Sequence, residues 1–310
     1  MVTRALRTLA LVASIGPALA GCKPDFGNPA SLVTERRILA SRAEPAEVRP
    51  GESATFDALV VSPAGTEATP ALDWALCNAP KPLDENNVVT SACLGDGSNL
   101  MGFGSQTDAA TDTVPALACS LFGPDPPPQA QGQPPLRPRD SDVTGGYYQP
   151  VRVVDGDIVA FALQRITCEL TRGGAQIAVQ YAMSYQANQN PKLIPLTATV
   201  DGAPVGLDAL PAGKEIDFAI GWTPESAESF PVFDLVSQSL ITHREALRVS
   251  WFATDGSFEH EVTGRDETET ETTTDDHWTA PKSAGVVHLW AVLRDSRGGV
   301  DFASYDLTVR

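Results

Sequence analysis

The stretch EPAEVRPGESATFDALVV, residues 44–61, decides the fold of the first half of this chain. A Pro-Gly turn at residues 50–51 leads into an apolar run at residues 55–61, and a further apolar run with Trp74 follows at residues 72–77. Short apolar runs separated by Pro-Gly turns at this spacing are typical of β-sandwich strands. The first half is therefore predicted to form a sandwich.

The same order of features returns in the second half. A run of β-formers at residues 196–200 is followed by Pro211-Ala212-Gly213 and then by an apolar run at residues 216–222. Trp251 then takes the place that Trp74 has in the first half. Such an internal repeat predicts a mainly β protein with two sandwiches in tandem.

The chain divides into five predicted segments, with one insert. They are a signal peptide (1–21), a tether (22–35), a first sandwich (36–171), a helix and linker (172–191) and a second sandwich (192–310). Within the first sandwich, residues 78–146 are rich in turn signals and proline, so we expect an irregular, exposed, disulfide-stapled insert. One short helix is expected at residues 175–187, where Ile177, Tyr181 and Tyr185 recur four apart.

The N-terminus carries an export signal. Arg4 and Arg7 precede an uncharged run at residues 9–20, which is too short to span a bilayer, and the run ends in Leu19-Ala20-Gly21-Cys22. This ending resembles the lipobox of bacterial lipoprotein signal peptides, which implies cleavage before Cys22 and lipidation of its thiol. The alternative is a plain secretory signal cut elsewhere, with Cys22 free or in a disulfide.

Lipidation defines the expected location and partners. Lys23 follows the lipidated position, which favours the outer membrane, because Asp there commonly retains lipoproteins at the inner one. The formal net charge of −17 excludes a general nucleic-acid binder and leaves attachment to the membrane to the lipid. We expect a protein anchored on the periplasmic face or the cell surface, with an envelope protein or a glycan as its partner.

Motifs in both halves resemble bacterial immunoglobulin-like domains. Residues 44–61 with Trp74 are similar to the opening of such a domain, and residues 278–281 with the turn at 295–299 are similar to the end of Ig-like or PKD-type modules. With the lipobox and residues 146–150, the chain is also similar to lipoproteins of myxobacterial type, a family with no assigned activity. The resemblance implies two Ig-like sandwiches and no particular function.

Four cysteines remain after Cys22, an even number for an oxidising compartment. None belongs to a C-x-x-C motif, so neither a redox site nor a zinc ribbon is indicated. The preferred pairing joins Cys77 to Cys93 and Cys119 to Cys168, because it staples both ends of the insert. The alternative joins Cys77 to Cys168.

No catalytic motif stands out in the sequence. The four histidines form no H-E-x-x-H, and no G-x-S-x-G is present. We therefore expect a non-catalytic protein without a cofactor. A hydrolase whose site assembles only in three dimensions is the remaining enzymatic alternative.

The strongest charge run is DETETETTTDD at residues 266–276. As a strand it would place Glu267, Glu269 and Glu271 on one solvated face, where like charges discourage edge pairing. The alternative is calcium binding at the ends of the run, with four candidate ligands: Asp266, Glu271, Asp275 and Asp276.

Aromatic residues supply the last alternative. The five tryptophans are expected in the core, although Trp278 flanks a loop and could offer a stacking surface to a sugar. Calcium- or carbohydrate-dependent adhesion is therefore the second functional hypothesis, behind a tethered envelope protein that binds a partner or acts as a spacer.

Overall fold

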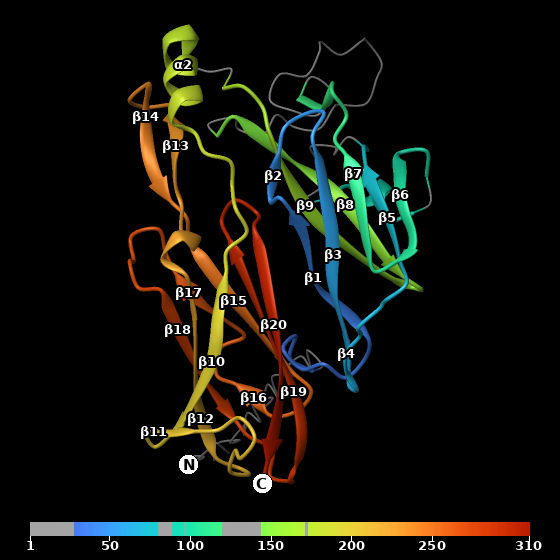
Figure 1. Cartoon of the computed structure of the whole chain (residues 1–310), viewed down its shortest axis with the longest axis vertical. Coiled ribbons are helices and arrows are strands. Elements are labelled where there is room, and N and C mark those ends of the chain that lie inside the picture. The colour runs from blue at the N-terminus through green and yellow to red at the C-terminus, as the bar shows by residue number, and fades with distance from the viewer. Residues whose placement is uncertain (1–27, 80–88, 96, 120–143, 171–172) are drawn as a thin grey trace, which may run out of the picture.

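The computed structural model describes residues 28–79, 89–95, 97–119, 144–170 and 173–310. Antiparallel strands dominate these residues, and α2 (Gly174–Ser184) is an α-helix of 11 residues between the two halves. The predicted mainly β fold is confirmed: strands before α2 and strands after it form separate sets of sheets (Figure 1). The helix begins within one residue of the predicted start and ends three residues earlier, at Ser184.

The first half forms two sheets. Sheet I has the strand order β2-β9-β8-β5-β6, and sheet II has the order β1-β3-β4 with β7 also paired to β3. The strands are β1 (Arg37–Glu44), β2 (Glu47–Val48), β3 (Ser53–Ser62), β4 (Gly65–Thr66), β5 (Leu72–Cys77), β6 (Leu100–Thr107), β7 (Ala109–Thr113), β8 (Gly146–Asp155) and β9 (Ile158–Thr167), and a 3-10 turn (η1) spans Ser91–Cys93. Phe56 of sheet II and Trp74 of sheet I meet in the core between them, with ring centroids 6.2 Å apart.

The prediction of an irregular insert at residues 78–146 was wrong for β6 and β7, which complete sheets I and II. Strand β6 was missed because glycine at residue 104 is typical of a turn. In the structure a Cβ on Gly104 would lie 2.5 Å from the Cβ of Ala110 and 3.1 Å from Cδ1 of Trp74, so glycine lets β6 pass close to the tryptophan. The proline-rich part of the insert lies outside the described residues.

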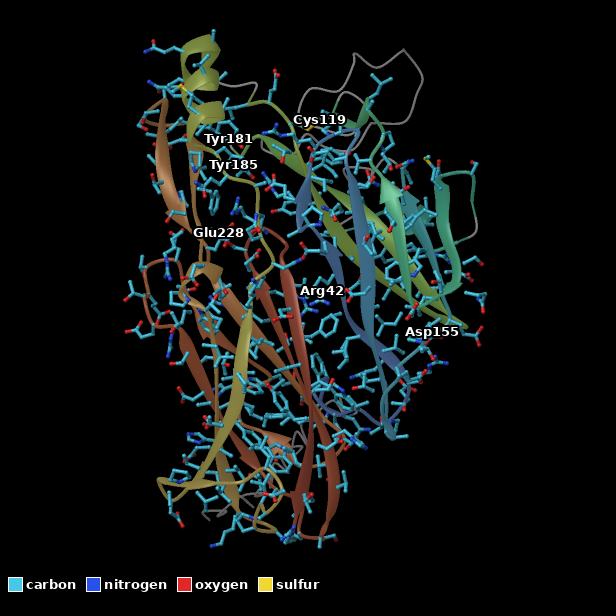
Figure 2. The ribbon with its side chains drawn as sticks, in the orientation of Figure 1. Arg42, Cys119, Asp155, Tyr181, Tyr185 and Glu228 are labelled. Carbon is cyan, nitrogen blue, oxygen red and sulfur yellow. A yellow bond between two sulfur atoms is a disulfide. The ribbon has the colours of Figure 1, made fainter. Side chains whose placement is uncertain are left out.

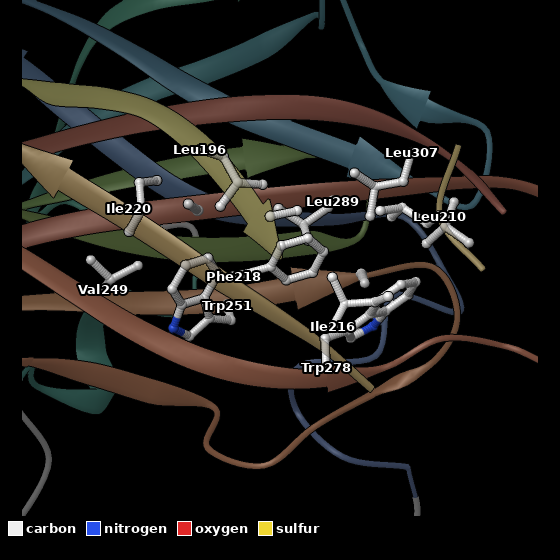
Figure 3. Packing of buried hydrophobic residues seen from close by; sticks show 14 of the residues in the cluster. Leu196, Leu210, Ile216, Phe218, Ile220, Val249, Trp251, Trp278, Leu289 and Leu307 are labelled. Carbon is white, nitrogen blue, oxygen red and sulfur yellow. The ribbon is translucent and has the colours of Figure 1, made fainter. Parts of the chain in front are cut away.

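The second half forms two further sheets and a separate hairpin. Sheet III has the order β17-β15-β19-β20, sheet IV has the order β11-β10-β12-β18-β16, and β13 pairs with β14. The elements are β10 (Leu193–Val200), β11 (Ala203–Val205), β12 (Glu215–Trp222), η2 (Pro224–Ser226), β13 (Ser229–Asp234), β14 (Ser239–Arg244), β15 (Leu247–Ala253), β16 (Ser257–Phe258), β17 (Val262–Arg265), β18 (Thr273–Thr279), β19 (Gly285–Asp295) and β20 (Val300–Val309). Figure 3 shows the core between sheets III and IV, where Trp251 and Trp278 lie among aliphatic side chains.

The two sandwiches pack face to face. Leu39 and Val61 of sheet II form a buried cluster with Trp290 and Val292 of sheet III. Sheet II is therefore covered on both faces, by sheet I on one side and by sheet III on the other. The four sheets form one stack, in the order I, II, III, IV.

The predicted tether, residues 22–35, was wrong for its last part. The backbone N–H of Val33 donates to the carbonyl of Ala253 at 2.8 Å, and the N–H of Ala253 donates to Ser31 at 2.9 Å. Val33 is 1% exposed, so its burial fixes this segment on the end of β15. In the part of the chain that the structure describes, no helix has the length and apolar character to cross a bilayer.

Candidate functional site

A largely buried cluster of charged side chains lies where the two halves meet, below α2. We call it the junction cluster, and its members are Glu47, Arg165, Glu228, Glu245, Asp295 and Arg297. Figure 2 labels Glu228 and, near it, Tyr185 of the segment that links the halves. A charged side chain that is buried without a partner lowers the free energy of unfolding. The stability of this region therefore depends on the hydrogen bonds and ion pairs that each of these groups makes.

Arg165 and Glu47 form the part of the cluster that belongs to the first sandwich. Nε of Arg165 lies 3.2 Å from Oε1 of Glu47, and both side chains are at most 1% exposed. The Tyr185 hydroxyl donates to the same carboxylate at 2.7 Å, and the backbone N–H of Asn188 donates to it at 2.8 Å. Glu47 therefore holds the linker against the first sandwich.

Arg297 connects this pair to the second sandwich. Its Nε donates to Oε1 of Glu245 at 2.6 Å, its Nη2 pairs with Glu228, and its Nη1 lies 3.8 Å from Oε2 of Glu47. The guanidinium also lies over the ring of Phe230, 4.6 Å from the centroid. One buried cation in the β19–β20 turn thus contacts carboxylates from both halves.

The cluster holds more carboxylates than guanidinium groups, and this excess shifts proton affinities. Burial and the neighbouring Asp295 raise the pKa of Glu245 to about 7, against the opposing effect of Arg297. Burial also raises the pKa of Asp295, although that carboxylate accepts from the backbone N–H groups of Gly299 and Arg297 and from Asn188. These hydrogen bonds and ion pairs hold the two sandwiches together, and their strength depends on pH because Glu245 and Asp295 have raised pKa values.

Sequence reasoning missed the whole junction cluster. Glu47 and Arg165 are 118 residues apart, and each has the sequence context of an ordinary surface charge. The one available signal was Arg297, which lies in the turn at residues 295–299 that the sequence singled out for its shape alone.

Both predicted disulfides are present: Cys77 bonds to Cys93, and Cys119 bonds to Cys168. The first closes a loop over a sequence separation of 16 residues, and the second ties the segment after β7 to the end of β9 across a separation of 49. The predicted lipidation site, Cys22, lies outside the described residues.

The acidic run forms the predicted strand only in its last four residues, 273–276. Residues 266–272 are a loop, and β18 begins only at Thr273. Asp266 and Glu269 close this loop on themselves, because the N–H of Asp266 donates to the Glu269 side chain and the N–H of Glu269 donates to the Asp266 carbonyl. The Glu269 carboxylate thus binds a backbone N–H of the loop instead of lying on a strand face.

The four calcium candidates are not brought together. Asp266 pairs with Arg248. Asp275 and Asp276 are neighbours on β18 and face opposite sides of sheet IV, one exposed and the other 2% exposed and bonded to His260. Glu271 stands exposed in the loop before β18. Among the described residues these four therefore do not form the calcium site that was the alternative for this run.

Each of the four histidines lies beside a carboxylate, and one such pair belongs to a larger group. Nδ1 of His277 lies 2.6 Å from Oδ1 of Asp217, its partner across β12 and β18, and Glu215 completes a group whose donor atoms lie within 4.8 Å of one another. The hydrogen bond to Asp217 raises the pKa of His277. A divalent ion would have to displace the proton that this pair shares.

Trp278 does not offer a surface to a sugar. Its side chain is 0% exposed, and its indole N–H donates to the carbonyl of Asp255. All five tryptophans are at most 1% exposed, which confirms their predicted place in the core.

Comparison with known proteins gives likenesses of low similarity. No family model matches the chain, and no curated protein matches it significantly. A lipoprotein from Bacteroides thetaiotaomicron is 13% identical with a TM-score of 0.22, and the match covers 37% of this chain and 79% of that one. The adhesin InvE of Yersinia pseudotuberculosis is 9% identical with a TM-score of 0.25, and the match covers 92% of this chain and 62% of the adhesin. Likenesses of this size carry no argument about function.

Proposed function

We propose that this chain is a non-catalytic lipoprotein of the bacterial outer membrane, anchored through lipid on Cys22. Its two sandwiches form one unit that binds an envelope partner. The observation that carries the proposal is the Leu19–Cys22 motif in front of a fold with two disulfides. Structural disulfides belong to oxidising compartments, which is where an exported lipoprotein resides.

The docked N-terminal segment adds geometry to this proposal. Eight residues, 23–30, lie between Cys22 and Ser31, so the two are nine residue steps apart and a fully extended chain spans at most about 32 Å between them. The end of β15, where Ser31 and Val33 dock, therefore stays close to the anchoring point. Figure 1 shows α2 and the β13–β14 hairpin at the end of the long axis opposite to β11 and β16. A partner would meet that remote end first.

The test is membrane fractionation of the expressed full chain, with mass spectrometry of the processed N-terminus. The wild type should fractionate with the outer membrane and carry a lipid on Cys22. Cys22→Ser or globomycin treatment should prevent lipidation and processing, and Lys23→Asp should move the protein to the inner membrane. A soluble wild-type protein, or an unmodified thiol at Cys22, would rule the proposal out.

A further inference from the structure

A partly open cavity of about 250 Å³ lies at the contact between the two sandwiches. Its walls come from three sheets: Ile38 and Ser41 on β1 of sheet II, Phe161 and Gln164 on β9 of sheet I, and Arg294 on β19 of sheet III. The β19–β20 turn of the second sandwich covers the side of the first sandwich where β1 and β9 face each other. The cavity therefore exists only in the assembled stack.

Arg294 is a cation without an anionic partner among the described residues. Its Nη2 donates to the carbonyl of Leu39 at 2.9 Å, and its Nη1 lies 3.5 Å from the hydroxyl of Ser250, both neutral groups. Burial lowers its pKa from the ordinary value, but a guanidinium stays protonated in proteins. The adjacent Asp295 does not neutralise it, because its oxygens accept from Asn188 and from backbone N–H groups of its own turn.

Two further polar atoms at the cavity lack partners. Oγ of Ser41 and Oε1 of Gln164 are buried and make no hydrogen bond in the described structure, and Gln164 as a whole is 1% exposed. Buried polar groups in folded proteins nearly always have a partner. A cation without a counter-ion and an unpaired hydroxyl at one cavity indicate that an anionic ligand supplies what the chain does not; the Gln164 oxygen is an acceptor, and a carboxylate leaves it without a donor.

We propose that this cavity binds a small organic carboxylate. A carboxylate provides the negative charge and the two acceptor oxygens that a guanidinium fork matches, and the Ser41 hydroxyl can donate to it as well. Asp295 also lines the cavity, with its oxygens held by Asn188 and by N–H groups of its own turn. Ile38, Phe56, Phe161 and Leu163 form an apolar part of the walls, which calls for an apolar body. The volume equals that of about eight water molecules at ~30 Å³ each, which suits a short or single-ring acid rather than a long fatty chain.

The test is calorimetric titration of the purified full chain with sodium benzoate, and with benzamide as the neutral probe of the same shape. Benzoate should bind and benzamide should not, because only the acid carries the charge that Arg294 lacks. Arg294→Met should weaken benzoate binding by at least about tenfold. Ala162→Leu should abolish it by filling the cavity while leaving Arg294 in place. Lys214→Met, which removes an exposed charge elsewhere, should leave it unchanged.

Thermal melts followed by tryptophan fluorescence check that each variant folds. If both cavity variants fail to fold, nuclear Overhauser contacts between benzoate and the Phe161 ring in the wild type decide the question instead. The absence of benzoate binding to the wild type overturns the proposal. So does equal binding of benzamide, equal binding to folded Arg294→Met, or bound benzoate without contacts to Phe161.

Discussion

Raising the pH from about 5 to about 8 should destabilise the folded chain through Glu245. This carboxyl is 1% exposed, and its pKa rises from 4.5 to about 7 because of burial and of Asp295. The folded state therefore holds the proton more tightly than the unfolded state. The stabilisation is fully present below pH 4.5 and is lost as the pH rises through about 7. At about 1.36 kcal/mol per pKa unit, a shift from 4.5 to about 7 corresponds to about 3 kcal/mol.

Urea unfolding followed by tryptophan fluorescence, at several pH values across this window, measures the effect. Glu245→Gln cannot titrate, so its free energy of unfolding should fall less between pH 5 and 8. It keeps one acceptor oxygen and replaces the other with a donor NH2 group, so either Arg297 or the N–H of Glu228 loses its acceptor and the variant is less stable than the wild type at low pH. The exposed Glu225→Gln is the matched control and should retain the wild-type dependence. A wild-type stability that stays level or increases with pH, or an identical slope in Glu245→Gln, would refute the reasoning.

Three further outcomes are expected. Arg297→Met should lower the free energy of unfolding by about 3–5 kcal/mol, because it leaves buried carboxylates unpaired; urea unfolding measures this, and a loss below 1 kcal/mol would contradict it. Cys119→Ser should lower the free energy of unfolding by about 4 kcal/mol and Cys77→Ser by about 3 kcal/mol, because the disulfide of Cys119 closes the longer loop. In thermal melts Cys119→Ser should therefore have the lower melting temperature; the reverse order would contradict this. Asp217→Asn should lower the pKa of His277, which an NMR titration of its ring protons reports directly; an unchanged value would show that the hydrogen bond does not hold the proton.

The strands that the sequence predicted are those whose signal is local. Trp74 and Trp251 stand in short apolar runs, and both are buried in the expected sandwiches. The helix was found because Tyr181 and Tyr185 recur at helical spacing, and their rings stack 4.8 Å apart. The disulfide pairing also followed from local reasoning, since each bond closes one end of the insert.

What could not be predicted depends on contacts between distant parts of the chain. Gly104 looked like a turn because its reason for being glycine, the closeness of Trp74, is a tertiary contact. Glu47 and Arg297 looked like surface charges because their pairing needs both sandwiches in place. The threonine-rich acidic run had the alternation of a strand, but hydrogen bonds from Asp266 to its own loop outweighed that pattern.

The double coverage of sheet II has a consequence for how this protein evolves. Tandem domains that share no buried interface can be duplicated, lost or exchanged one at a time, because each keeps a polar surface. Here a gene that encoded only the first half would leave Leu39 and Val61 bare, and one that encoded only the second would expose Trp290. Recombination between the halves is therefore expected to be selected against, so that the two are inherited together.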